Sequence, residues 1–150
     1  MDRKIFILPA TVYDIVEQDF KTLLAPAVER AQGREDVDTV WEHVKTGSHQ
    51  AWMIFETPKK PLGAMVTHIA EYPLRDMLSI DWLAGENMDD WIEDLLTNLE
   101  RFAKETRCVG LEIIGRPGWA KYLAKYGWTA PHVVCEKFFG DPVTAAQDAA

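Results

Sequence analysis

Residues 109–128 read VGLEIIGRPGWAKYLAKYGW and contain the clearest structural signals of the chain. Residues 109–114 are apolar almost throughout, which is typical of a central strand covered on both faces. Pro117 suits the first turn of a helix, and Gly127 suits the residue that ends one. The stretch therefore predicts a buried strand, a tight turn and a short helix.

The N-terminal part of the chain predicts one strand and two helices. The apolar residues 5–8 indicate an edge strand, because Pro9 follows them directly and lacks an N–H for a sheet ladder. Asp14 is a candidate cap of the first helix, and Asp36 or Asp38 is the candidate cap of the second. Both helices carry apolar residues at helical spacing, so each is expected to bury one face.

The middle of the chain predicts an antiparallel meander. Its three strands are expected at residues 50–56, 62–72 and 77–83, with short turns between them. In the third strand, alternation predicts one face for Leu78, Ile80 and Trp82 and the other for Ser79 and Asp81.

A long amphipathic helix is expected to begin at Asp89 or Asp90 and to cross over to the strand at residues 109–114. Such a crossover makes its two flanking strands parallel neighbours. A closing strand is predicted at residues 133–139. The pattern as a whole predicts an α+β fold with a mixed sheet of about six strands, four helices and a crossover at residues 84–109. We expect one domain over residues 1–140 and a flexible tail over residues 141–150.

Composition narrows the classes of function. The 150 residues carry a net charge of −8, which disfavours nucleic-acid binding through a basic face. Cys108 and Cys135 form no CxxC motif, as expected of reduced thiols in a cytoplasmic protein. No apolar run approaches the roughly 20 residues that a membrane-spanning helix needs. We therefore expect a soluble cytoplasmic protein that binds neither nucleic acid nor membrane.

The order of elements, together with Gly115-Arg116, Gly118-Trp119, Leu123 and Gly127-Trp128, resembles the GNAT acyltransferase superfamily. The segment is similar to the GR-x-GW…L…GF pattern of GNAT-like proteins often encoded by bacteriophages and prophages. The resemblance implies an acetyl-CoA-dependent N-acetyltransferase acting on a small amine or a basic protein segment. It equally allows a catalytically silent GNAT-fold protein that binds a protein partner, for example as a virion component in the host cytoplasm.

The resemblance also implies where acetyl-CoA would bind. In the superfamily, backbone N–H groups at the start of the crossover helix hold the pyrophosphate, in a loop of the type Q/R-x-x-G-x-G/A. Asp90 and Ile92 occupy the positions of the expected glycines, and Gly85 is the nearest glycine. The candidate cofactor-binding residues are Trp82, Leu83, Ala84, Gly85, Asn87 and Met88. Asp89 or Asp90 is better explained as a helix cap than by a role in phosphate binding.

Candidate catalytic residues are Glu71, Asp81 and Tyr126. The resemblance implies a tyrosine acid on the last helix at the position of Leu123. Tyr122 and Tyr126 flank that position, and Tyr126 is the candidate retained, although burial of an amphipathic ring also explains either tyrosine. An alkylamine is mostly protonated at neutral pH, so a general base is also needed. His68, Glu71, Asp81 and Glu112 are the candidate bases, although Glu112 is equally explained by a charged pair with Arg116 or a lysine.

Metal ligation is not predicted from spacing. The four histidines are His43, His49, His68 and His132, and neither their mutual spacing nor their spacing to cysteine matches a metal motif.

Overall fold

The structure is a computed structural model that describes residues 4–141. The chain divides into two compact units, residues 1–112 and residues 113–150. The elements in chain order are β1 (Lys4–Ile7), a 3-10 helix (Ala10–Val12), α1 (Tyr13–Glu29), α2 (Val37–Lys45), β2 (Gln50–Thr57), β3 (Lys60–Tyr72), β4 (Arg75–Gly85), α3 (Met88–Glu105), β5 (Gly110–Ile113) and α4 (Pro117–Ala124).

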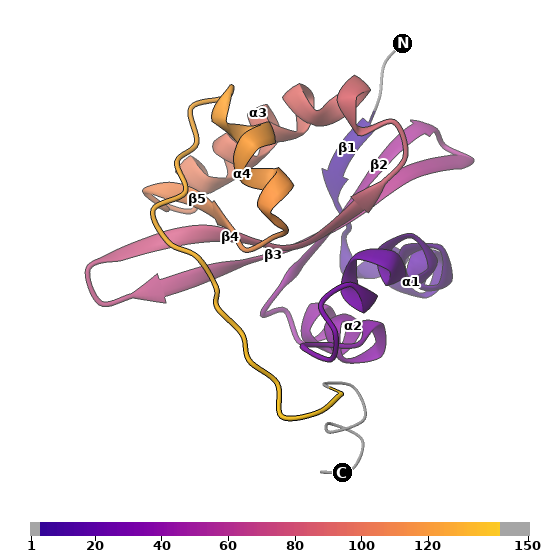
Figure 1. The fold of residues 1–150 in the computed structure, drawn as a ribbon. Coiled ribbons are helices and arrows are strands. Elements are labelled where there is room, and N and C mark those ends of the chain that lie inside the picture. Colours follow the sequence, from indigo (N-terminus) through magenta and orange to yellow (C-terminus); the bar gives the residue numbers. More distant parts are fainter. Residues whose placement is uncertain (1–3, 142–150) are drawn as a thin grey trace. The chain divides into compact units, whose positions relative to one another are not determined.

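One sheet organises the fold, with the strand order β1-β2-β3-β4-β5 (Figure 1). The pairs β1–β2, β2–β3 and β3–β4 are antiparallel, as the predicted meander requires. The sheet is mixed, so its parallel pair is β4–β5, on either side of the crossover helix α3. The N–H of Val109 donates to the carbonyl of Asp76 at 2.9 Å, which joins the starts of these two strands. The α+β class, the crossover and the parallel neighbours are therefore confirmed.

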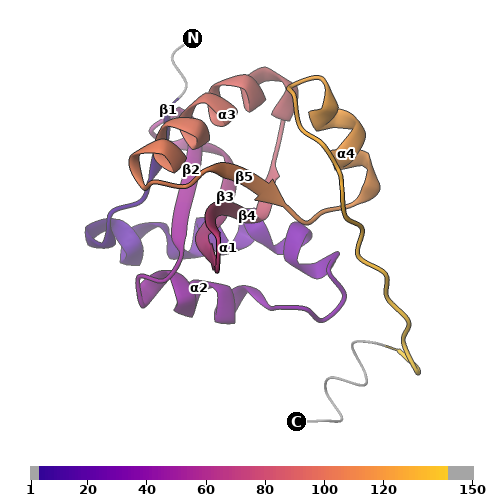
Figure 2. The same cartoon turned by 90° about the vertical axis from the view of Figure 1, so that its left-hand side faces the viewer.

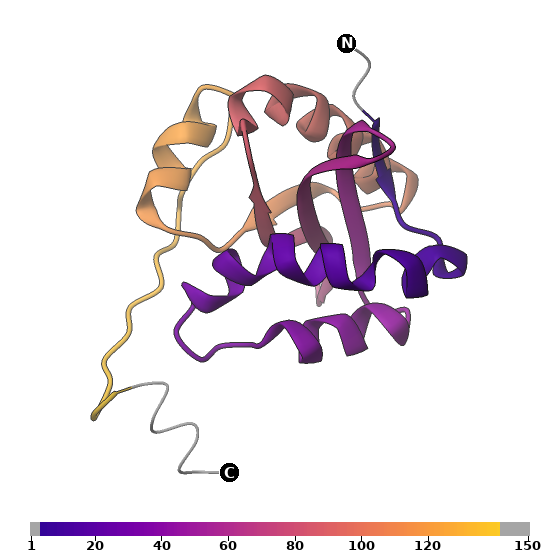
Figure 3. The same cartoon turned by 90° about the vertical axis from the view of Figure 1, so that its right-hand side faces the viewer.

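Helices α1 and α2 cover one face of the sheet, whereas α3 covers the other (Figures 2 and 3). The core beneath α1 and α2 joins helix residues to alternate residues of β2 and β3. Its buried members are Leu8, Phe20, Leu24, Val28, Val40, Trp41, Val44, Ala51, Met53, Ala64 and Val66. Burying each large side chain contributes about 1.5–3 kcal/mol, so this layer fixes α1 and α2 on the sheet.

Helix α3 is held by a continuous apolar face. It buries Trp91, Ile92, Leu95, Leu96, Leu99 and Ala103, which recur at helical spacing. The Phe102 ring lies edge-on to Trp52 of β2, with ring centroids 5.5 Å apart. The stripe predicted from the sequence is thus the surface that packs on the sheet.

The helix starts differ in part from the prediction. Asp36 caps α2 by accepting the Thr39 N–H at 2.8 Å. Asp14 lies in the first turn of α1 rather than at the cap, because a 3-10 turn precedes the helix. The cap of α3 is Asn87, in a left-handed conformation with φ of 54°, instead of Asp89 or Asp90.

The second unit contains α4 and a long segment without regular structure. Helix α4 begins at Pro117 as expected, and Gly127 has the positive φ of 88° that suits a helix end. The closing strand predicted at residues 133–139 is wrong. These residues form no strand and are exposed, because β propensity yields a strand only where another strand supplies hydrogen-bond partners. The described part of the sheet therefore has five strands, and the tail predicted at 141–150 falls almost entirely outside the described residues.

None of the helices within residues 4–141 combines the length and the apolar character that crossing a membrane requires.

Candidate functional site

An irregularity in β4 places Asp81 at the centre of the candidate site. In the β3–β4 register, Val66 pairs with Trp82 but Thr67 pairs with Ile80. Asp81 is therefore the extra residue of a β-bulge, a feature that locally bends a strand and redirects its side chains. The predicted alternation is wrong beyond this point. Trp82 packs against the core beneath α1 and α2, to which Leu78 does not belong, because the inserted residue reverses the pattern.

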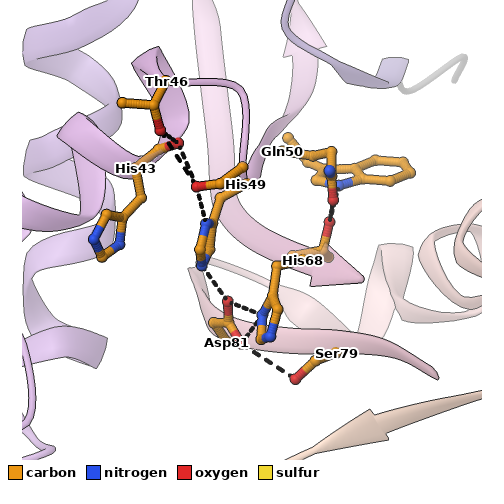
Figure 4. A network of polar contacts seen from close by, with 10 residues as sticks. His43, Thr46, His49, Gln50, His68, Ser79 and Asp81 are labelled. Carbon is orange, nitrogen blue, oxygen red and sulfur yellow. Dashed lines mark hydrogen bonds and ion pairs between the residues drawn. The ribbon is translucent and has the colours of Figure 1, made fainter. Parts of the chain in front are cut away.

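Asp81 and His68 form the closest polar pair of the site (Figure 4). The His68 Nδ1 lies 2.7 Å and 2.9 Å from the two carboxylate oxygens of Asp81. Since a carboxylate accepts hydrogen bonds, Nδ1 of His68 is the nitrogen that donates an N–H to Asp81. Ser79 donates a further hydrogen bond to Oδ1 of Asp81 at 3.2 Å. The geometry holds a carboxylate and an imidazole in fixed mutual orientation.

A second histidine approaches the same carboxylate. His49 Nε2 lies 3.4 Å from Oδ2 of Asp81, and the His49 and His68 rings are 4.9 Å apart. The side chains of His49, His68 and Asp81 are 22%, 32% and 18% exposed, so the cluster is shielded but open to solvent. Burial lowers the pKa of His49 below its usual value; the Asp81 carboxylate opposes this shift, whereas His68 and His43 add to it. The shift favours the uncharged form of the His49 imidazole.

The turn after α2 positions His49. Gly47 has a φ of 87°, a conformation that glycine adopts without strain. The hydroxyl groups of Thr46 and Ser48 donate to the carbonyl of His43 at 2.9 Å and 3.1 Å and so satisfy the end of the helix. The Ser48 Oγ also lies 2.8 Å from His49 Nδ1.

Three of the four histidines therefore lie side by side, which spacing in the sequence did not reveal. His43 stacks on His49 with ring centroids 5.0 Å apart, and His49 neighbours His68. The three come from α2, the loop before β2, and β3, so their contact depends on strand pairing. The pairing of Gln50 with Thr67 sets His49 beside His68. The pairing register of the predicted β2–β3 hairpin is the signal from which the contact between these histidines could have been found.

The other candidate bases lie elsewhere. Glu71 is exposed and pairs with Asp76, five residues before Asp81 and so about 16 Å away along the strand. The structure does not bring Glu71 and Asp81 together. Glu112 is half-buried, and its Oε2 accepts a hydrogen bond from the Tyr72 hydroxyl at 2.9 Å, so the partner found is a tyrosine rather than the arginine or lysine expected.

The candidate cofactor-binding residues follow one another from the end of β4 to the start of α3. Leu83, Ala84 and Gly85 pair with Met65, Ala64 and Gly63 of β3.

The loop that follows is held by packing. A Cβ on Gly85 would lie 2.7 Å from the carbonyl oxygen of Leu62 and 2.9 Å from the Trp91 ring. The Glu86 N–H donates to that same Leu62 carbonyl at 2.8 Å, and the Trp91 indole donates to the Glu86 carbonyl at 2.7 Å. Close packing of β4 against β3 and α3 therefore explains why residue 85 is a glycine. The Glu86 N–H is already hydrogen-bonded within the protein, to the Leu62 carbonyl.

Tyr126 belongs to the second unit. Its N–H donates to the Leu123 carbonyl at 2.9 Å, and its ring lies 6.2 Å from Tyr122. The Lys125 ammonium lies 4.5 Å from the Tyr122 ring centroid and 5.3 Å from that of Tyr126. The catalytic role of Tyr126 stays a prediction.

Solved structures identify the fold. No protein-family model matches the chain, and no curated protein has a significant match to its sequence. Glucosamine-6-phosphate N-acetyltransferase from Arabidopsis thaliana superposes with a TM-score of 0.64 at 15% identity, over 93% of this chain and all of that one. An aminoglycoside acetyltransferase from an uncultured soil metagenomic sample, in complex with sisomicin, gives 0.64 at 16% identity, over 92% and 95%. A GNAT family acetyltransferase from Staphylococcus aureus gives 0.62 at 11% identity, over 93% and 100%. The chain has the GNAT fold.

Proposed function

We propose that this protein is an N-acetyltransferase that moves an acetyl group from acetyl-CoA to an amine. The observation that carries the proposal is the Asp81–His68 pair, with a 2.7 Å contact at the β4 bulge of a GNAT fold. The similarity to acetyltransferases under 25% identical supports the fold, and this pair supplies the acid–base groups that the reaction requires.

The arrangement suits a cationic substrate. The Asp81 carboxylate attracts an ammonium group, and the free Nε2 of His68 accepts the proton that the amine must lose before it attacks. The neutral amine then forms a bond to the acetyl carbon, the C–S bond breaks, and the thiolate of CoA leaves and takes up a proton. Holding the amine and the thioester together lowers the barrier without a covalent enzyme intermediate.

We place acetyl-CoA along residues 82–88, as the resemblance implies. The first N–H groups of a helix lack intrahelical acceptors and favour anions, which supports a pyrophosphate position at the start of α3. Asp89 and Asp90 oppose that ligand because both lie in the first turn. We therefore expect weaker binding of acetyl-CoA than a glycine-rich loop would give.

The competing proposal is a catalytically silent GNAT-fold protein that binds a protein partner. It is favoured by the acidic first turn of α3 and by the Glu86 N–H, which donates to Leu62 instead of facing a ligand. A role in a phage particle and a cytoplasmic location stay predictions.

The test measures binding and transfer separately. Calorimetry of the full-length protein with acetyl-CoA asks whether the donor binds, and CoA release is then followed with a polyamine, an aminoglycoside and a lysine-rich peptide. Asp81→Asn and His68→Gln should each lower kcat/KM by about 100-fold or more, the usual scale of a lost general base. Glu100→Gln, which removes a carboxylate from the exposed side of α3, should leave it unchanged.

Absence of acetyl-CoA binding at millimolar concentration would reject the enzyme and favour the silent protein. Acetyl transfer that survives Asp81→Asn but is lost in Glu71→Gln would assign the role of general base to Glu71, at the distant end of β3. Loss of turnover in Tyr126→Phe, with acetyl-CoA binding intact, would support the predicted acid.

A further inference from the structure

Three side chains of the site form a set with metal-binding character. One donor atom each of His49, His68 and Asp81 lies within 4.8 Å of the others. The residues come from the loop before β2, from β3 and from the β4 bulge, and they converge as Figure 4 shows. All three are partly buried, and two of them are imidazoles, so the set differs from an ordinary acidic surface cluster.

We infer that His49, His68 and Asp81 bind a divalent transition-metal ion of the zinc type. Two imidazole nitrogens and one carboxylate oxygen suit Zn²⁺ and its neighbours in the first transition row. Mg²⁺ and Ca²⁺ take oxygen ligands almost exclusively, so this donor set discriminates against them. The inference goes beyond acetyl transfer and does not depend on it.

Two of the three separations between donor atoms lie within about 0.6 Å of the spacing that zinc requires. Ligands at about 2.0–2.2 Å in a tetrahedron lie roughly 3.3 Å from one another. The His49 Nε2 is 3.4 Å from Oδ2 of Asp81 and already meets that spacing. The His68 Nδ1 is 2.7 Å from the same oxygen, so an incoming ion replaces its proton and separates the pair by about 0.6 Å.

Hydrogen bonds around His49 point its free nitrogen at the carboxylate. The Ser48 hydroxyl donates to the His43 carbonyl at 3.1 Å, so its oxygen is left to accept the Nδ1–H of His49 at 2.8 Å. Nε2 then presents a lone pair to Oδ2 of Asp81, and two acceptors face each other. A cation between them stabilises this arrangement. Metal-bound histidines typically donate their second ring N–H in this way.

The carboxylate is oriented too. Ser79 donates to Oδ1 of Asp81 at 3.2 Å, while Oδ2 is the oxygen shared by both histidines. Three protein ligands leave one position of a tetrahedral ion for water or another ligand. Because the ion would occupy Asp81 and His68, zinc and an amine substrate would exclude each other.

The test uses the untagged, metal-free, full-length protein. Calorimetry with Zn²⁺ should show one ion per chain, and Co²⁺ should give the visible absorption of a tetrahedral complex. His49→Gln, His68→Gln and Asp81→Asn should each weaken Zn²⁺ binding by at least about tenfold. His132→Gln is the matched control, because it removes an exposed histidine of the second unit and should not alter the affinity.

Circular dichroism and a thermal melt establish that each variant is folded. If His68→Gln or Asp81→Asn fails to fold, His49→Gln decides, because His49 lies outside the strands. The inference is overturned if the native protein binds no Zn²⁺ at millimolar concentration, if Mg²⁺ binds equally well, or if binding is unchanged in every folded variant of the three ligands. These readouts stand whether or not acetyl transfer is found.

Discussion

At the scale of single residues, Asp81 shows how a local irregularity creates a reactive position. In a regular strand its side chain would simply alternate with those of its neighbours. The bulge leaves Asp81 without a cross-strand partner, between Ile80 and Trp82, whose partners are Thr67 and Val66. Its carboxylate therefore meets His68 and His49, and the site depends on one extra residue in β4.

Asp36 provides a residue-scale prediction about stability. Its carboxylate accepts the Thr39 N–H at 2.8 Å and the Thr39 hydroxyl at 3.1 Å, and these contacts lower its pKa, the backbone bond most. Asp36→Ala should lower the free energy of unfolding by about 0.5–2 kcal/mol at neutral pH, measured by urea denaturation. Asp36→Asn keeps an acceptor and should lose less.

The same variant has a defined pH dependence. Because the native pKa of Asp36 is below its unfolded value, the ionised carboxylate stabilises the fold above the unfolded pKa of about 3.9. That stabilisation is lost as the pH falls through the native pKa, so the wild type and Asp36→Ala should converge in acid. A difference that stays constant on acidification would show that the charge contributes nothing.

At the scale of elements, the start of α3 combines two opposing demands. Asp89 and Asp90 stabilise the first turn, because negative charge interacts favourably with the positive end of the helix dipole. The same charges repel the pyrophosphate that the proposed function would place there. The charges in the first turn of α3 therefore favour helix stability over anion binding.

This conflict gives a prediction that rests on the proposed function. The double variant Asp89→Asn, Asp90→Asn should bind acetyl-CoA about threefold to tenfold more tightly, since it removes two nearby negative charges. The helix should lose about 0.3–1 kcal/mol of stability for each carboxylate removed. Calorimetry measures the affinity and thermal unfolding measures the stability.

A charge-matched control distinguishes the effect of charge at the start of α3 from the effect of the net charge of the protein. Glu93→Gln, Asp94→Asn changes the net charge equally, one turn further along the exposed side of α3. It should have a smaller effect on acetyl-CoA affinity. An equal gain in acetyl-CoA affinity in both double variants would mean that only the net charge matters. No gain in either variant would show that the pyrophosphate does not bind at the start of α3.

At the scale of the whole molecule, the two cysteines report on folding. Cys108 is only 7% exposed, and its N–H donates to the Ala103 carbonyl at 2.8 Å, whereas Cys135 is exposed. A thiol reagent should modify one cysteine of the native chain rapidly and the other only at the rate of unfolding. Cys135→Ser should abolish the rapid phase. Two rapid phases of equal size in the native protein would show that the packing around Cys108 opens without unfolding.

Much of the fold could be predicted because its signals are local. The meander, the crossover helix and the parallel neighbour of β4 follow from apolar periodicity and chain connectivity, and Asp36 caps α2 by contacts within four residues. The prediction of a strand at residues 133–139 was wrong because a strand does not depend on local signals alone. Its residues favour extended backbone, but a strand also requires a partner edge, which local sequence does not specify.

Apolar periodicity and residue chemistry were sufficient to predict the class of fold, the positions of the helices, and Asp81 and His68 as candidate bases. The folded chain was needed to show that Asp81 occupies a bulge, that Glu71 lies far along the sheet, and that His49 joins the site. The difference arises from strand register. Bringing His49, His68 and Asp81 together depends on which residues pair across β2, β3 and β4, and that pairing is fixed by the packed core as a whole.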